Sequence, residues 1–132
     1  MSNVSHHCQD NDFKEFIESQ LLYRKVISVE AKSDQIAELT LDNGVVLEAY
    51  GNEGCGGCGN GWYYLTELNT CDNVITRVEL VETTNEISDD VFSIFVYAED
   101  NRINLLSYEG GDNGYYGVGY EIKVKKHLTN NT

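Results

Sequence analysis

The chain of 132 residues contains no proline and no linker-like shift in composition. Nothing in it therefore predicts an internal domain boundary, and its length suits a single domain with one hydrophobic core. It also shows no repeat at a fixed period, which argues against a solenoid or a propeller.

Basic residues are scarce: nine Lys and Arg stand against 22 Asp and Glu, a formal net charge of -13. A field of this sign repels phosphate backbones, so we expect no direct binding of nucleic acid. The charge can serve solubility, a partner protein with a basic surface, or divalent cations held by clustered carboxylates. No Asp-rich loop has the spacing of a calcium site, which weakens the last interpretation.

Long apolar runs are also missing. No segment approaches the roughly 20 apolar residues of a membrane span, and residues 1–12 lack the apolar core of a signal peptide. We therefore expect a cytoplasmic protein without membrane contact, whose four cysteines stay reduced.

The common catalytic motifs are absent as well. The chain has no Gly-x-Ser-x-Gly elbow and no His-Glu-x-x-His, and its histidines, His6, His7 and His127, lie near the two ends. We accordingly expect no enzymatic activity.

What is present is mostly β periodicity. Asp10 to Leu22 predicts a helix, because Phe13, Phe16, Ile17 and Leu21 have helical spacing, and Asp10 or Asn11 could cap it. From Arg24 onward apolar residues alternate with a period of two, and Asn43-Gly44 predicts a hairpin with both turn residues at positive φ. The predicted strands are 25–31, 36–41, 45–50, 74–82, 91–99 (a central strand), 103–108 and 118–125.

These segments predict an α+β, mainly β fold. We expect an antiparallel meander sheet or partly open barrel of six to seven strands, with one or two short helices. The predicted organisation is a disordered N-terminal segment at 1–9, a single β-rich domain at 10–126 and a frayed tail at 127–132.

Eleven of the twelve glycines fall in two aromatic-rich windows, 51–61 and 110–119. Glycine lets a ligand approach the main chain closely, and neighbouring aromatics offer stacking surfaces. Both windows are also compatible with ordinary hairpin loops whose aromatic residues cover the core. The candidate ligand-binding residues are Trp62, Tyr63, Tyr64, Asn113, Tyr115, Tyr116 and Tyr120.

Cys55 and Cys58 form a Cys-Gly-Gly-Cys-Gly turn, and Cys71 follows downstream. Such a turn suits a zinc knuckle, so these three cysteines are candidate ligands of a structural zinc ion. A thioredoxin-like redox pair would need a helix start, which a glycine run between strands does not provide. Unligated thiols in a tight turn remain the third interpretation.

Several motifs occur in a distinctive order. They are Leu-Asp-Asn-Gly, the Cys-Gly loop leading into Trp-Tyr-Tyr, Asp-Asn-Val-Ile-Thr, Phe-Ser-Ile-Phe-Val-Tyr-Ala-Glu-Asp and Asn-Gly-Tyr-Tyr-Gly. This order resembles an uncharacterised family of bacteriophages and related mobile elements, the domain of unknown function 7448, over about Val26 to Val124. The resemblance implies a phage context and, in a host cell, the host cytoplasm; it implies no activity.

Three functional hypotheses follow. The first is a small acidic phage-type accessory protein that acts by binding, for instance by inhibiting a host or defence protein with a basic surface. The second is a protein that binds or sequesters a small ligand, nucleotide-like or other, with the two Gly/Tyr loops, which requires the loops to lie close together. The third is a structural zinc-binding module.

Overall fold

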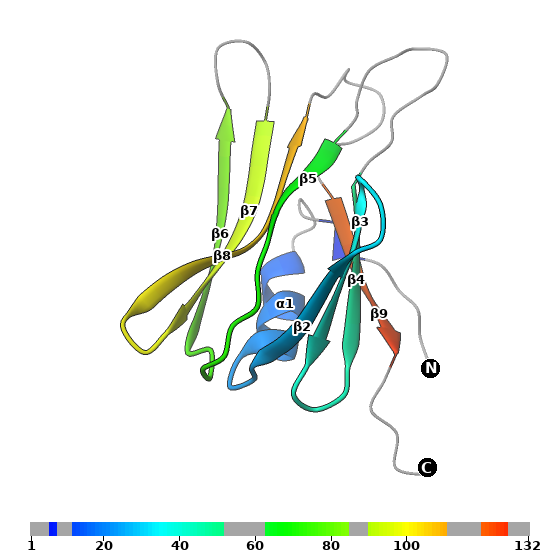
Figure 1. Cartoon of the computed structure of the whole chain (residues 1–132). Coiled ribbons are helices and arrows are strands. Elements are labelled where there is room, and N and C mark those ends of the chain that lie inside the picture. Colours follow the sequence, from blue (N-terminus) through cyan, green and yellow to red (C-terminus); the bar gives the residue numbers. More distant parts are fainter. Residues whose placement is uncertain (1–5, 8–11, 52–62, 85–89, 111–119, 127–132) are drawn as a thin grey trace, which may run out of the picture.

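The computed structural model describes residues 6–7, 12–51, 63–84, 90–110 and 120–126, which form two antiparallel sheets and one helix (Figure 1). The first sheet has the order β1-β9-β4-β3-β2 and the second the order β5-β8-β7-β6. The elements are β1 (His6–His7), α1 (Phe13–Leu21), β2 (Val26–Ala31), β3 (Ile36–Leu41), β4 (Val46–Gly51), β5 (Tyr63–Leu68), β6 (Arg77–Thr84), β7 (Asp90–Ala98), β8 (Asn101–Gly110) and β9 (Tyr120–Lys126).

Two three-stranded meanders form the body of the sheets, because consecutive strands pair as neighbours: β2, β3 and β4 in one sheet and β6, β7 and β8 in the other. The chain crosses from the first sheet to the second after Gly51 and returns after Gly110. Strands β4 and β9 then pair in the first sheet, and β5 and β8 pair in the second. These non-local pairs tie the meanders together.

The core lies between the sheets, as strict alternation along the strands requires. In β3 and β4 every second residue is buried, and in β9 the side chains of Tyr120, Ile122 and Val124 point inward. The facing sheet contributes residues such as Ile94 and Leu106.

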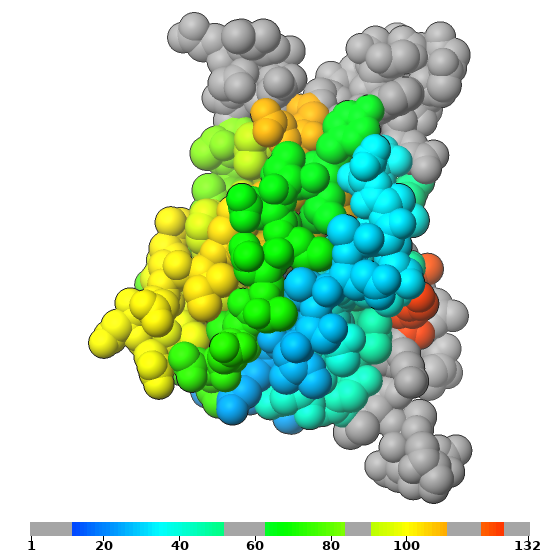
Figure 2. Space-filling view, in the orientation of Figure 1, coloured from blue at the N-terminus to red at the C-terminus, as the bar shows by residue number. Residues whose placement is uncertain are grey.

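Along one side the sheets meet: β5 lies beside β2 and β3 (Figure 2). The amide of Leu65 donates to the carbonyl oxygen of Asp34, and Cys71 forms a bridge with Val26. Along the other side the sheets diverge, and α1 packs there against β6 and β1. Its residues Phe13, Ile17 and Leu21 are buried, so the helix fills the gap that strand pairing leaves open.

The predicted fold class is confirmed: the described residues are mainly β with one short helix, arranged as two sheets without a closed barrel. The described strands number nine rather than six or seven. Strand β5 was missed because its sequence directly follows a glycine-rich window and reads as part of that loop. Strand β7 is internal in its sheet, as predicted.

Two local predictions differ from the structure. The helix begins at Phe13 with Asp12 at the N-cap position, while the predicted caps at 10 and 11 lie outside the described residues. In the Asp42-Asn43-Gly44 turn only Gly44 has positive φ, at 89°. The amide of Gly44 donates to Leu41 and that of Leu41 donates to Val45, which is typical of a three-residue loop rather than a two-residue turn.

The short strand β1 pairs His6 with Ile122 and His7 with Glu121 of β9. It lies inside the segment 1–9, for which the sequence predicts disorder. The rest of that segment and the tail at 127–132 lie outside the described residues.

Candidate functional site

Both glycine-rich windows are anchored at the same end of the molecule. Gly51, where β4 ends, pairs with Tyr120, where β9 begins. Tyr63, where β5 begins, pairs with Gly110, where β8 ends. The segment 52–62 joins the end of β4 to the start of β5, and the segment 111–119 joins the end of β8 to the start of β9. All four of these strand ends therefore lie at one end of the molecule. We call this the loop end (Figure 1).

A cluster of aromatic side chains lies directly beneath the loop end. The rings of Tyr108 and Tyr120 stack with 5.1 Å between centroids, and Phe92 meets Tyr120 edge-on at 6.4 Å. Phe92 also contacts Tyr63 at 5.7 Å, and Phe13 of α1 contacts Tyr120 at 5.8 Å. Offset and edge-to-face geometries of this kind add stabilisation beyond area burial. Tyr120 thus connects both sheets and the helix.

Gly51 is required by the close approach of the sheets at this end. A Cβ at this position would lie 2.5 Å from the carbonyl oxygen of Tyr63 and 2.9 Å from the ring of Tyr108. The Tyr108 hydroxyl donates to the carbonyl oxygen of Gln35 at 2.8 Å, and the Gly51 amide donates to the same oxygen. Burial, with a smaller effect of Glu48, raises the pKa of Tyr108, so the phenol stays protonated.

A cavity of about 160 Å³ opens beside this cluster, on the side where the sheets diverge. Its apolar walls include Phe13, Leu80, Phe92 and Tyr120. Among the described residues that line it, Glu82 is the one with a charged side chain. Glu82 is exposed and pairs with Phe92 across β6 and β7, which places both on the inner face of the second sheet. The cavity is therefore an aromatic hollow with a carboxylate at its solvent side.

The predicted ligand-binding residues fall into three groups. Tyr63 and Tyr120 are 0% and 2% exposed and belong to the core, as the interpretation of the loops as core-covering hairpins expects. Tyr64, at 39% exposed, lies on the outer face of the second sheet. Trp62, Asn113, Tyr115 and Tyr116 lie outside the described residues.

Cys71 is buried at the opposite end of the sheets from Gly51 and Tyr63. Its thiol donates to the carbonyl oxygen of Asn73 at 3.3 Å. Burial raises the pKa of this thiol, which disfavours the thiolate that zinc requires. Cys55 and Cys58 lie outside the described residues, and within the described ranges no three His, Cys, Asp or Glu side chains group as metal ligands. The three-cysteine site stays a prediction.

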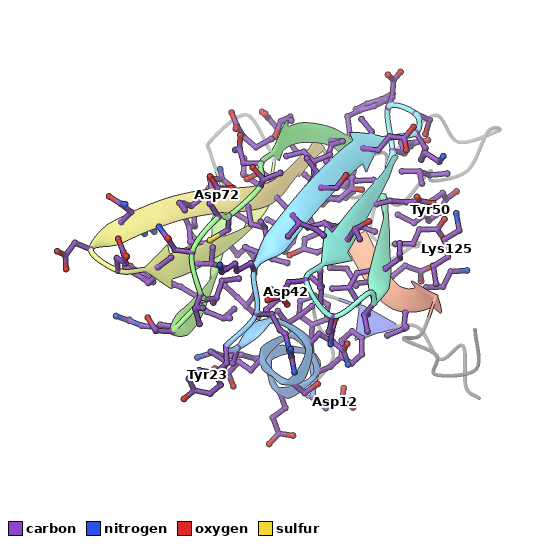
Figure 3. All side chains as sticks on the ribbon, turned by 60° about the horizontal axis from the view of Figure 1, so that its bottom comes forward. Asp12, Tyr23, Asp42, Tyr50, Asp72 and Lys125 are labelled. Carbon is purple, nitrogen blue, oxygen red and sulfur yellow. The ribbon has the colours of Figure 1, made fainter. Side chains whose placement is uncertain are left out.

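On the outer face of the first sheet, charged side chains occupy the positions that alternate with the core residues along each strand. Lys123 pairs with Glu48 at 3.4 Å, and Lys125 pairs with Glu38. The hydrogen bond that Lys125 donates to the Glu38 carboxylate raises the pKa of Lys125. Figure 3 shows Lys125 on this outer face, directed away from the second sheet. Lys123 and Lys125 thus neutralise carboxylates of β4 and β3.

Most described cations are neutralised in the same way by the chain's own acids. Lys14, Arg24, Lys32 and Arg102 each lie within 4 Å of a carboxylate, as do Lys123 and Lys125 of β9. Because the chain has more than twice as many acids as bases, the remaining carboxylates leave the surface strongly negative.

Three exposed acids lie along the line where β5 meets β2 and β3: Asp34, Glu67 and Asp72. Asp34 is joined to β5 by the hydrogen bond from Leu65, and Asp72 follows the bridge between Cys71 and Val26. We call them the seam acids. Within the described residues none of the three takes part in an ion pair, so their carboxylates contribute uncompensated negative charge along this line.

Sequence reasoning did not identify Phe13, Phe92 and Glu82 as site residues. The apolar pattern placed Phe13 and Phe92 in the helix and a central strand, but not near each other. For Glu82 a signal existed, because it continues the inward-facing series Val78 and Leu80 of an alternating strand. A carboxylate at an inward position of a strand marks a rim or a polar site.

Among the described residues, no helix is long and apolar enough to span a bilayer.

The fold and the loop end define a small two-sheet β domain with an acidic exterior and an aromatic hollow. Residues 19–122 match the family model of DUF7448, a domain of unknown function, so the chain belongs to this family. No curated protein and no solved structure matches the chain.

Proposed function

We propose that this chain is a binding protein that acts on a partner protein with a basic surface, and that the binding inhibits a host or defence protein. The observation that carries the proposal is the charge balance. Six of the described cations are paired with the chain's own carboxylates, while the seam acids remain exposed. Complementary charge accelerates association and excludes partners of like charge. The resemblance to phage-associated proteins supports a host or defence protein as the target.

The test compares the native protein with a triple variant of the seam acids, Asp34→Asn, Glu67→Gln and Asp72→Asn. A matched control, Glu15→Gln, Glu99→Gln and Asp100→Asn, changes the net charge equally on the helix and the β7–β8 turn. Each protein is immobilised, and proteins retained from a host-cell lysate are quantified at low and high salt. The lysate protein that is retained in the largest amount is then purified, and its affinity for each of the three proteins is measured by calorimetric titration.

We expect a defined complex that weakens steeply with salt, because exposed charges are screened beyond about 8–10 Å at physiological ionic strength. The seam variant should weaken it more than the control variant does. If the complex persists at high salt, and if the seam variant binds as tightly as the control variant, the acidic surface does not determine the binding.

A second candidate function is small-ligand binding at the loop end. It is favoured by the shared anchoring of the two glycine-rich windows above an aromatic cavity. Native mass spectrometry of the protein as purified tests it: a ligand should add a discrete mass that is lost after denaturation. A bare protein that also gives no thermal shift with nucleosides or aromatic compounds would count against it.

A further inference from the structure

Exposed hydrophobic side chains gather at the end of the sheets opposite the loop end. Among the described residues four large hydrophobic side chains are exposed, and three of them come together here. These three, which we call the exposed triad, are Tyr23, Ile27 and Val74, with exposed fractions of 71%, 56% and 41%. Single exposed hydrophobic residues are normal on a protein surface, whereas a group of them marks an interaction site.

Backbone contacts bring the triad together from two segments that are far apart in the sequence. The amide of Tyr23 donates to the carbonyl oxygen of Ile75 at 2.7 Å, and Val26 forms an antiparallel bridge with Cys71. Each member of the triad is one of these four residues or the direct sequence neighbour of one. The contacts that join the end of α1 and β2 to the segment after β5 therefore also assemble the triad.

The triad lies on the outward side of this paired backbone. The residues that alternate with it are at most 1% exposed: Val26, Cys71 and Ile75. Because successive residues of an extended chain point to opposite faces, Ile27 and Val74 point away from the core. Asp72 alternates with Cys71 in the same way and is exposed on the same side as Val74. Figure 3 shows Tyr23 beside α1, with its side chain directed away from both sheets.

Irregular backbone holds two members of the triad in the solvent. Tyr23 has a φ of 65°, which bulky residues rarely adopt, and it follows the C-cap residue of α1, where glycine is the usual choice. Ile27 lies at the β-bulge between Val26 and Ser28, so that Ile27 and Ser28 are both exposed. A glycine at the first position and a polar residue at the second would suit the fold better. Residues that break a local rule in this way cluster at functional sites.

The charges around the triad favour a basic protein as its occupant. Asp72 lies between the paired residues, and Glu67 lies on β5, which contacts β2. Both are exposed seam acids, and neither is in an ion pair within the described residues. Of the two neighbouring cations, Arg24 is 3.9 Å from a carboxylate and Lys25 is half-buried. A hydrophobic centre with an acidic rim complements an apolar side chain surrounded by lysine and arginine.

We propose that the exposed triad is the centre of the surface on which the basic partner protein docks, with Tyr23 as its main anchor. This inference rests on the proposed function and adds to it the place of contact. Tyrosine is enriched among the residues that dominate binding energy, because it combines a large apolar ring with a polar tip. A second copy of this chain suits the surface less well, because both copies carry a formal net charge of -13.

The first experiment uses short peptides and requires no partner. N-acetyl-Leu-Arg-Leu-Arg amide is titrated into labelled protein, and the ring signals of Tyr23 and the methyl signals of Ile27 and Val74 are followed by NMR. One control peptide has citrulline in place of arginine, and the other has serine in place of leucine. We expect saturable shifts centred on the triad, and weaker binding of both control peptides. Equal binding of all three peptides, or shifts centred elsewhere, would overturn the docking surface.

Two tyrosine variants separate a contact role of Tyr23 from a structural one. Tyr23→Asn removes the ring where the left-handed backbone accepts asparagine readily, so the free energy of unfolding should not fall. Tyr50→Thr removes a half-buried ring from the outer face of the first sheet, on another side of the molecule (Figure 3). Tyr23→Asn should weaken the complex with the partner by about tenfold or more, and Tyr50→Thr by less than about twofold. Tyr23→Asn that unfolds more easily than the native protein would show instead that the ring supports the fold.

The partner titration also separates this inference from the proposed function. If Tyr23→Asn and Tyr50→Thr bind the partner equally while the seam variant binds it weakly, the triad is excluded and the acidic binding surface stands. If no partner is retained at low salt, the proposed function fails, and with it the partner as occupant.

Sedimentation of the protein alone tests the second copy as occupant. We expect the native protein to be a monomer at the concentrations of the titration. A dimer that Tyr23→Asn dissociates would place a second copy of the chain on the triad and overturn the proposal.

Discussion

The ring of Tyr108 stacks on the ring of Tyr120 with 5.1 Å between centroids, which joins β8 of the second sheet to β9 of the first. Both residues are buried: Tyr108 lies near the end of β8 and Tyr120 begins β9, on either side of the segment 111–119 that connects the two sheets. The contact therefore fixes the separation of the sheets at the loop end. The cavity beside Tyr120 depends on this separation.

Substitution of Gly51 tests how tightly the sheets approach. In Gly51→Ala the new Cβ would meet the Tyr63 carbonyl oxygen at 2.5 Å, a backbone atom that cannot rotate away. We expect a loss of about 1–3 kcal/mol in the free energy of unfolding, measured with urea, from overpacking. Ser28→Thr adds a methyl group on the exposed face of β2 and should cost less than about 0.5 kcal/mol. Equal stability of Gly51→Ala and the native protein would contradict the close approach.

The Tyr108 hydroxyl should contribute to stability in a pH-dependent way. Tyr108→Phe removes the hydrogen bond to Gln35, and we expect a loss of about 1 kcal/mol at neutral pH. Because burial raises the pKa of the folded phenol above its ordinary value of 10.0, the unfolded chain loses this proton first as the pH rises. The native protein therefore loses stability above about pH 10 through this group, and the phenylalanine variant does not.

Urea unfolding at neutral pH and above about pH 10 measures this effect. The stability difference between the native protein and Tyr108→Phe should narrow as the pH rises. Ile75→Val changes a buried side chain without a titrating group, so its difference from the native protein should stay constant. A constant difference for Tyr108→Phe as well would show that its phenol ionises equally in both states.

Glu79 should titrate at lower pH than an ordinary glutamate. The hydrogen bond from the Tyr97 hydroxyl, followed by that from Arg102, lowers its pKa below 4.5. In Tyr97→Phe the pKa of Glu79, measured by carbon NMR of its carboxyl group, should rise toward 4.5. Tyr23→Phe removes a hydroxyl that does not contribute to this shift and should leave the pKa of Glu79 unchanged.

The same shift has a consequence for acid stability. Because the folded-state pKa of Glu79 is depressed, its stabilising contribution is present above the unfolded-state value and is lost as the pH falls through the folded value. The difference in stability between the native protein and Tyr97→Phe should therefore shrink in acid. If the difference in stability stays the same in acid, the Tyr97 hydroxyl does not stabilise the fold through its hydrogen bond to the Glu79 carboxylate.

Cys71 should be protected from alkylation in the folded protein. Its side chain is 1% exposed, and burial raises the pKa of its thiol, so both access and thiolate are limited. Peptide-resolved mass spectrometry should show modification of Cys71 slowed by about 100-fold or more relative to the unfolded chain, at a rate set by opening of the core. Rapid modification in the native protein would place this thiol at the surface.

Local pattern predicted much of the fold. The period of two along β3, β4 and β9 placed Tyr120, Ile122 and Val124 inward, and the structure confirms this. The helical spacing of Phe13, Phe16, Ile17 and Leu21 identified the packed face of α1, on which Phe16 is partly buried and the other three are fully buried. Strand β5 was missed, because its six residues follow a glycine-rich window and carry a β-bulge between Leu65 and Glu67 that breaks the alternation.

The sequence by itself determined the fold class, the acidic exterior and the absence of the common catalytic motifs, since composition and short-range periodicity encode these directly. Tertiary structure decided that the two glycine-rich windows share one end, and that Phe13, Phe92 and Glu82 line one cavity. Phe13 lies far along the chain from the paired strands β6 and β7 that carry Glu82 and Phe92, and the packing of α1 against β6 brings them together. The ends of the two windows adjoin because β4 pairs with β9 and β5 pairs with β8. Such non-local pairing depends on how two sheets and a helix bury their apolar faces jointly, which no local stretch of sequence specifies.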